Sequence, residues 1–244
     1  FRGLYIDTVE KEWEVHPILH LDLNTANYKE PDSLDAVLNN SLTEWEKLYG
    51  AEPSETTAPL RFKGIVERAA KLTGQKTVIL IDEYDKPLLQ NMTNAVQQEH
   101  FHNSLKAFYS VLKTQDRYIE FALLTGVTKF SKVSVFSDQN NLNDISMDRA
   151  YATICGITEE EIDTCFKDSV EELARANGLT IEETRARLKE LYDGYHFTPT
   201  SAGIYNPFSV LCTFSKQEFN NYWFEMSTPT FLAEMLKNFK YRLP

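Results

Sequence analysis

The chain lacks the sequence features of proteins that are stabilised by disulfides or structural zinc, or that span a membrane. Its 244 residues include only three cysteines, at positions 155, 165 and 212, and an odd number without Cys-x-x-Cys spacing argues against a disulfide framework or a structural zinc site. We therefore expect three buried thiols. No apolar run approaches the roughly 20 residues that cross a bilayer, and no signal peptide is visible. We expect no membrane contact and an intracellular, cytoplasmic location.

Basic residues are outnumbered by acidic ones, 25 to 36. The formal net charge of -11 argues against non-specific nucleic-acid binding through the whole surface, although a local basic patch would be compatible with it. A hydrophobic fraction of 42% is enough for one large domain, or for a main domain with a smaller companion. The first residues resemble the end of an earlier element, so we expect part of a longer protein.

The first two thirds of the chain alternate apolar strands with amphipathic helices. Leu48 and Leu72 are among the side chains that the helical period places on buried faces. The alternation is typical of a parallel sheet with right-handed crossovers and helices on both faces. We expect, in order, a strand at 16–23, a helix at 34–48, a helix from Pro59, a strand at 77–82, a helix at 95–114 and a strand ending at Thr125.

The character of the sequence changes near residue 157. We expect an irregular insertion or short hairpin at 131–146, a short strand at 151–157, and helices at 158–176 and 181–192 separated by Asn177-Gly178. Two short strands should follow, then a helix capped by Asn206 with Pro207 in its first turn, and last an amphipathic helix at 227–239. The pattern predicts two domains, an α/β core at 1–157 and a helical, winged-helix-like domain at 158–244.

An acid pair follows the middle strand in "VILIDEYDKPLL", residues 78–89. Ligands of open parallel sheets bind at the carboxyl ends of the strands, where Asp82 and Glu83 lie. Four apolar residues before Asp-Glu form the Walker B pattern, in which the Asp holds Mg²⁺ and the Glu polarises the attacking water. Both acids can face one pocket only if the chain already turns at Glu83. The alternative is that both acids simply end a strand in solvent.

"ALLTG" supplies a second strand ending in a polar residue, Thr125, which in such sheets can sense a terminal phosphate. The glycine-rich Walker A pattern that cradles phosphates is missing. "TGQKT", at 73–77, follows a helix, precedes a strand and has the wrong glycine spacing. The residues alone therefore predict half of a nucleotide site.

Longer stretches resemble the bacterial AAA-ATPase-like family, whose predicted ATPase domain is often followed by a PD-(D/E)XK-type nuclease domain. The resemblance covers nearly the whole chain, and it rests on "FRGLYI", "HPILHLDL", "VILIDEYDKPL", "LLTGVTKFSKVSVFSDQNNLNDIS", "YATICGITEEEI", "LYDGYHF", "YNPFSVL" and "YWFEMSTPTFL".

The resemblance implies a P-loop NTPase-like α/β fold, an ATP and Mg²⁺ site, and a middle fragment that lacks the Walker A strand. It makes Asp82 the Mg²⁺ ligand, Glu83 the base that activates water, and Thr125 with Lys129 the sensor region. The missing strand usually lies between the Walker B and sensor strands, so its absence should leave a gap or force a rearranged sheet. Nucleic acid would be a partner through the nuclease-like domain, which lies downstream in the family.

Two other functions compete with the ATPase hypothesis. Residues 158–244 could form a non-catalytic module that contacts a protein or nucleic acid, with a small basic end at Lys237, Lys240 and Arg242. "DEYDK" could instead supply the acids and lysine of a nuclease. Its Glu-x-x-Lys spacing and the proline at position 87, which would interrupt a central strand, argue against that assignment.

Overall fold

A computed structural model describes residues 2–127, 142–198 and 200–222. The chain divides into two compact units, residues 1–142 and 143–244, and each has its own cluster of buried apolar side chains. The division precedes the expected boundary near residue 157. Residues just before that boundary belong to the second unit, since Ile157 pairs with Tyr205 and Gly156 lies against Ile204.

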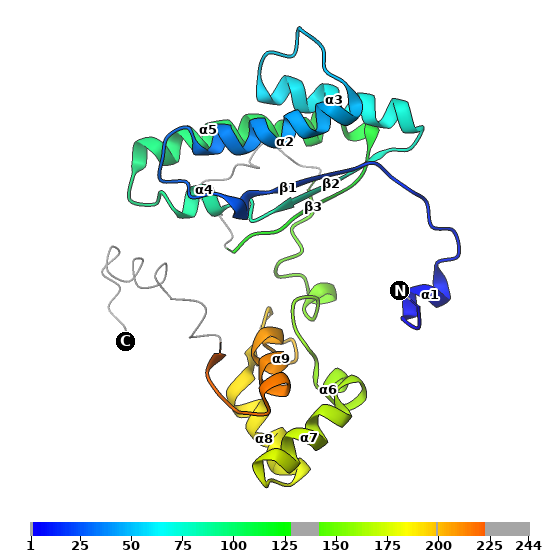
Figure 1. Ribbon diagram of the computed structural model, residues 1–244, viewed down its shortest axis with the longest axis vertical. Helices are drawn as coiled ribbons and strands as arrows, with labels where there is room; N and C mark the ends of the chain where they lie inside the picture. The colour runs from blue at the N-terminus through cyan, green and yellow to red at the C-terminus, as the bar shows by residue number, and fades with distance from the viewer. Residues whose placement is uncertain (1, 128–141, 199, 223–244) are drawn as a thin grey trace. The chain divides into compact units, whose positions relative to one another are not determined.

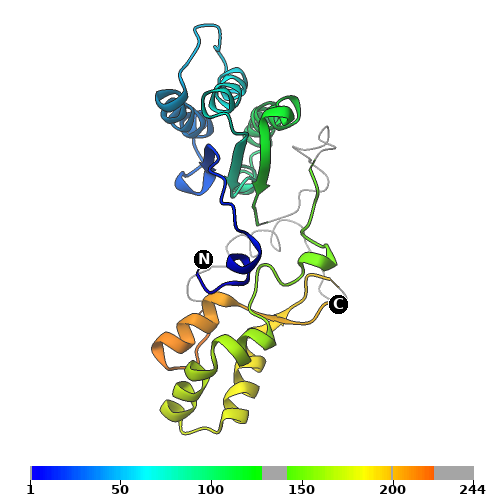
Figure 2. The same cartoon turned by 90° about the vertical axis from the view of Figure 1, so that its right-hand side faces the viewer.

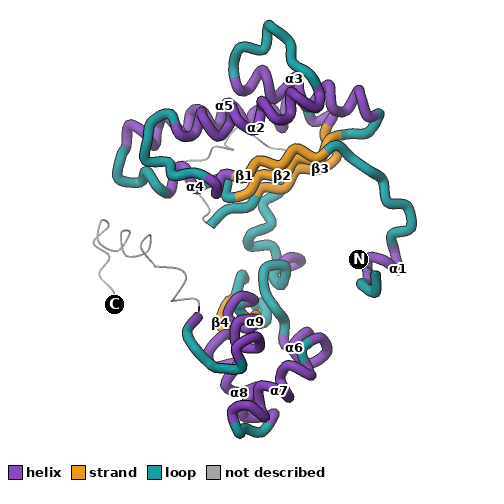
Figure 3. The backbone as a smooth tube through the Cα atoms, in the orientation of Figure 1, coloured by secondary structure: helices purple, strands orange, loops and turns teal. Residues whose placement is uncertain are grey.

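The first unit is an α/β layer whose elements follow the predicted order (Figures 1 and 3). Strand β2 and helix α5 have the predicted bounds, and no helix was expected for α1. The elements are α1 (Tyr5–Val9), β1 (Ile18–Asp22), the 3-10 turn η1 (Leu23–Thr25), α2 (Ser33–Tyr49), α3 (Ala58–Thr73), β2 (Thr77–Asp82), α4 (Lys86–Leu89), α5 (Ala95–Thr114), η2 (Asp116–Tyr118) and β3 (Ile119–Leu124).

The strands form a three-stranded parallel sheet in the order β1-β2-β3. Ile18 of β1 is level with Val78 of β2, and Asp22 is level with Asp82. Strand β3 pairs with β2 from Thr77 to Ile81. The carboxyl ends of all three strands therefore meet at one edge of the sheet.

Helices α2, α3 and α5 all cover one face of this sheet (Figure 2). On that face Leu19, Ile79 and Ile81 are buried, whereas Ile18 and Phe121 on the other face are 57% and 53% exposed. The expectation of helices on both faces is therefore wrong for the described residues. The strand order explains this, because right-handed crossovers that always step in the same direction place every connecting helix on the same side.

The main helices of the first unit, α2, α3 and α5, bury an apolar stripe as their periods predict, with two exceptions. Phe62 of α3 stacks on Phe108 of α5 with ring centroids 4.4 Å apart, at the centre of the core. Leu48 and Leu72 are 70% and 69% exposed, not buried as expected. Both lie in the last turn of their helix, past the side chains that pack on the sheet.

The second unit is helical with a two-stranded hairpin. Thr158 and Thr180 each cap a helix by accepting the backbone N–H three residues on, with Glu161 and Glu183 completing reciprocal capping boxes. The described elements are η3 (Arg149–Tyr151), α6 (Glu159–Cys165), α7 (Lys167–Asn177), α8 (Ile181–Tyr192), β4 (Asp193–Tyr195), β5 (Ile204–Tyr205) and α9 (Pro207–Lys216). The predicted stop at Gly178 is confirmed by its φ of +65°, which glycine adopts without steric cost.

Several expectations for this unit are wrong. The helix expected at 158–176 is broken at Phe166, whose ψ of 13° is not helical and whose ring stacks on Phe214. The strand expected at 151–157 is absent: Tyr151 ends η3, residues 152–156 form a turn and a bend, and only Ile157 makes a β-bridge. The cysteines are not buried thiols: two are exposed and the third is half-buried. Ile181 and Leu191 of α8 are exposed, although the helical period of this segment places both side chains inward.

Three expected features lie wholly or mostly outside the described residues: the insertion at 131–146, the helix at 227–239 and the basic end of the chain. Among the helices that the structure describes, none is both long and apolar enough to cross a membrane.

Candidate functional site

The chain turns sharply where β2 ends. Asp82 is exposed on the face of the sheet that the helices leave open, and Glu83 has a φ of +55°. Left-handed backbone costs a non-glycine residue roughly 1–2 kcal/mol, so surrounding contacts must hold it. The turn that the Walker B hypothesis requires at Glu83 is therefore present.

Thr125 lies beside this turn, as predicted. Its hydroxyl donates a hydrogen bond to Oδ1 of Asp82, and its backbone N–H donates to the carbonyl of Ile81 at 2.9 Å. The carbonyl of Thr125 in turn accepts the N–H of Tyr84 at 2.9 Å. Thr125 thus orients the carboxylate of Asp82 and ties the residues on either side of Glu83 to the end of β3.

The carboxylate of Glu83 differs from its neighbours because no hydrogen bond or ion pair engages it among the described residues. Its pKa is raised above the ordinary value, first by partial burial and then by the negative charges of Asp85 and Asp82. A carboxylate that is unengaged, easily protonated and held at a strained turn has the properties of a general base.

Two residues of this edge, Asp22 and Asn24, were missed by sequence reasoning. Asp22 ends β1 level with Asp82 and caps η1 by accepting the N–H of Asn24 at 2.7 Å. Lys86 donates to the carbonyl of Asn24 at 2.7 Å and to its side-chain oxygen. The signal was available, because "HLDL" and "LIDE" both end an apolar strand in Asp.

The third acid of the motif, Asp85, is fully buried. Its Oδ1 accepts the backbone N–H of Val127 at 3.2 Å. Lys86 begins the short helix α4 and is turned toward Asn24, so "DEYDK" does not form the strand that a nuclease motif would need. Lys129, the other predicted sensor residue, lies outside the described residues.

The donor set fits magnesium only in part. Within residues 2–127, 142–198 and 200–222, no three His, Cys, Asp or Glu side chains are placed to share a metal ion. Mg²⁺ commonly binds through one or two carboxylates, with water and substrate phosphates filling the other positions. Asp82 therefore fits an ion that arrives with a nucleotide, and does not fit a resident metal held by protein ligands alone.

The sheet has no gap between the strand of the acid pair and the strand of Thr125. Strands β2 and β3 are hydrogen-bonded neighbours, whereas the resemblance places a phosphate-binding strand between them. Of the two expected consequences of its absence, a gap between these strands is excluded, and a rearranged sheet stays a prediction. In the part of the sheet that the structure describes, the outer edges of β1 and β3 are the ones left for another strand.

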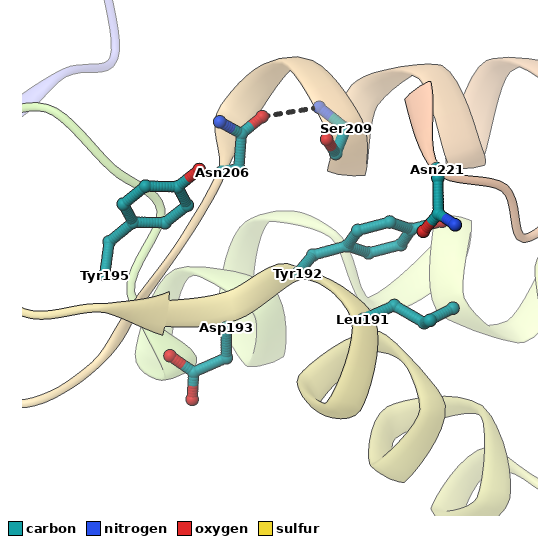
Figure 4. Close-up of a pocket in the computed structure, with 7 residues that line it drawn as sticks. All are labelled: Leu191, Tyr192, Asp193, Tyr195, Asn206, Ser209 and Asn221. Carbon is teal, nitrogen blue, oxygen red and sulfur yellow. Dashed lines mark hydrogen bonds between the residues drawn. The ribbon is translucent and has the colours of Figure 1, made fainter. Parts of the chain in front are cut away.

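The second unit contains a small pocket at the end of α8 (Figure 4). In it the side chain of Asn206 accepts the N–H of Ser209 and caps α9. Tyr192 lies opposite, and its hydroxyl accepts from Thr213 at 2.7 Å. The carboxylate of Asp193 points away from Asn206. These groups stabilise the unit, and the predicted winged-helix character and partner-binding role remain predictions.

Comparison with known proteins identifies the first unit. A family model described as "Predicted AAA-ATPase" matches residues 1–136. A protein from Azotobacter chroococcum mcd 1, described as an uncharacterized protein in the vnfD 5' region, is 38% identical over 239 residues. That match covers 97% of this chain and 43% of the relative, so the chain spans less than half of the relative's length. No solved structure gives a significant match. Because the family model covers more than half of its residues, the chain belongs to the predicted AAA-ATPase family.

Proposed function

We propose that residues 1–142 form the catalytic half of a P-loop NTPase-like ATPase site, which hydrolyses the terminal phosphoanhydride of a magnesium nucleotide in the protein that carries this chain. One observation carries the proposal. The turn after the middle strand of a parallel sheet holds a carboxylate oriented by Thr125 next to an unengaged carboxylate on strained backbone. A solvent-exposed strand end would require neither feature.

Each residue has a separate role in this proposal. Asp82 holds Mg²⁺ through the oxygen that Thr125 does not engage, and Glu83 accepts a proton from the attacking water. Thr125 keeps the carboxylate of Asp82 in place and lies where a terminal phosphate would be sensed. The ion, when bound, supplies charge that stabilises the transferring phosphoryl group. Lys129 is proposed as a further sensor residue on the family resemblance alone.

The phosphate-binding loop must come from outside the described residues, since no Walker A pattern occurs in the sequence. The longer relative shows that such proteins can carry additional chain. A P-loop strand would pair with an outer edge of the sheet, beside β1 or β3. We therefore expect residues 1–244 alone to bind ATP weakly and to hydrolyse little of it.

The test is ATP turnover by the full-length protein with Asp82→Asn and Glu83→Gln. General-base catalysis is typically worth 10²–10⁴-fold, so Glu83→Gln should lower kcat by about 10²-fold or more with little change in KM. Asp82→Asn should weaken the dependence on Mg²⁺ as well. Glu120→Gln, which neutralises an exposed acid on β3, is the matched control and should leave turnover unchanged.

Two results would overturn the proposal. Turnover that survives both substitutions would remove the assigned roles. Absence of any Mg²⁺-dependent nucleotide binding by the full-length protein would remove the site. The competing role, a binding module formed by the second unit, predicts instead that binding to a macromolecular partner persists undiminished in both variants.

A further inference from the structure

The proposed reaction does not use Asp85, although this side chain is placed with more constraint than either Asp82 or Glu83. It is fully buried, whereas a carboxylate that serves only solubility stays in water, because burial of a charge is costly without compensating hydrogen bonds. Its Oδ1 accepts the N–H of Val127, and its backbone carbonyl accepts the N–H groups of Leu88 and Leu89. Asp85 therefore joins the turn after β2 to the chain after β3.

Gly126 makes this approach possible. A Cβ at position 126 would lie 2.7 Å from Oδ1 of Asp85 and 2.7 Å from the ring of Tyr84, closer than atoms of real side chains approach. The backbone of residues 125–127 thus lies directly against the turn that carries Glu83. A residue with a side chain fits there only if the side chains of Asp85 and Tyr84 shift.

Glu83 lies in the middle of these contacts. Ile81 accepts the N–H of Thr125, Tyr84 donates to the carbonyl of Thr125, and Asp85 accepts the N–H of Val127. The contacts bracket the one residue of the turn whose backbone is left-handed. Since that backbone is strained, it keeps its conformation only while the neighbouring contacts hold it.

We propose that Asp85 and Gly126 form a clasp that positions Glu83 for the proposed hydrolysis, so that Asp85 is a positioning residue and not a catalytic one. This inference rests on the proposed function, because there is nothing to position without the reaction. The clasp also couples the end of β3 to the base. A movement of residues 125–127 on nucleotide binding would reach Glu83 through Asp85.

The kinetic test compares Asp85→Ala and Asp85→Asn in the full-length protein with ATP and Mg²⁺. The alanine variant should lose at least tenfold in kcat, with KM within threefold of the wild type. The asparagine variant should recover most of kcat, because its amide oxygen can accept the N–H of Val127. Gly126→Ala should resemble Asp85→Ala. A destabilising core variant, Ile79→Val, should keep kcat, which separates positioning from general loss of stability.

Amide hydrogen exchange tests the clasp without relying on turnover. In Asp85→Ala, exchange at Tyr84, Thr125 and Val127 should accelerate at least tenfold, while exchange in α2 and α3 stays unchanged. Unchanged exchange at these three amides would overturn the clasp. An Asp85→Ala variant that keeps its kcat while Glu83→Gln loses it would overturn the positioning role alone. Absence of turnover in the wild type would overturn the proposed function and this role with it, and exchange would still decide whether the clasp exists.

Discussion

The two units of the chain are held together in different ways. In the first, strands from distant parts of the sequence pair side by side, as Ile18 does with Val78. In the second, helices that follow one another pack together, and two of them, α6 and α8, begin with capping boxes. Only the first arrangement brings residues from separate crossovers to a single edge. Residues that act together on a ligand can therefore gather there without being close in sequence.

The acid pair at the sheet edge also differs in its partners from Glu159 of the second unit. In the second unit Glu159 accepts from Arg185 at 2.8 Å and from the hydroxyl of Tyr205 at 2.7 Å. In the first unit the nearest cation to the acid pair in sequence, Lys86, is bonded to Asn24. Among the described residues, no ion pair engages Asp82 or Glu83, so both acids are available to a cation.

Removal of the aromatic centre of the first unit should have the largest effect. Phe62→Ala deletes a fully buried ring stacked on Phe108 and should cost about 3–5 kcal/mol of unfolding free energy. Exchange in α2, α3 and α5 should rise, while exchange in α7 and α8 stays unchanged. Hydrogen-exchange mass spectrometry under native conditions measures both. A matching rise in α7 and α8 would mean that the units unfold together.

A smaller loss is expected at the polar centre of the second unit. The hydroxyl of Tyr192 donates to the carbonyl of Asn220 and accepts from Thr213 and from the N–H of Asn220. Tyr192→Phe leaves these groups unpaired and should cost about 1–3 kcal/mol. Urea denaturation checks the loss, with Tyr151→Phe, an exposed tyrosine, as the control. An unchanged unfolding free energy would contradict this prediction and would mean that water takes the place of the hydroxyl.

Acid should weaken the first unit through an ion pair on its helices. Hydrogen bonds from Arg61 lower the pKa of Glu46. A lowered folded-state pKa adds stability above the ordinary value of 4.5, and that stability is lost as the pH falls through the folded-state pKa. Glu46→Gln should therefore flatten the stability profile below about pH 5, at a cost near neutrality of about 1 kcal/mol. If stability falls with pH in parallel for the wild type and Glu46→Gln, the Glu46–Arg61 pair is not the source of the acid sensitivity.

The smallest predicted change in unfolding free energy is a gain in stability, whereas the three changes above are losses. Glu83→Asn replaces a left-handed glutamate by a residue that tolerates this conformation, and should stabilise the first unit by about 0.5–1 kcal/mol. The raised pKa of Glu83 adds to this gain. A carboxyl whose pKa is higher in the folded state destabilises the fold as the pH rises, and Glu83→Asn removes that carboxyl. Thermal unfolding at pH 7 measures the gain. Gln217→Asn, at the other left-handed position, is the backbone control, since it changes no charge.

The sequence predicted the strands and the main helices of the first unit because these signals are local. Apolar runs located β2 and β3, and the helical period of its apolar side chains located α5. The bare face of the sheet was not predictable from such signals. Whether helices cover one face or two depends on strand order, which is a non-local property that no single segment encodes.

For the candidate site, too, the residues marked by local signals were predicted and those brought together by tertiary contacts were not. Asp82, Glu83 and Thr125 each end an apolar strand or follow one, and the structure brings them together. Asp85 and Gly126 were not singled out, because their roles arise from a contact between turns some 40 residues apart. Tertiary contacts of this kind leave no periodic trace in the sequence.

The uncovered side of the sheet has a practical consequence for handling the protein. Ile18, Phe121 and Leu123 expose apolar surface beside unpaired strand edges, a combination that drives copies of a chain to associate. A net charge of -11 opposes this at low ionic strength, and added salt screens that repulsion. Purified residues 1–244 should therefore grow in apparent size as salt increases, the reverse of an assembly held by ion pairs.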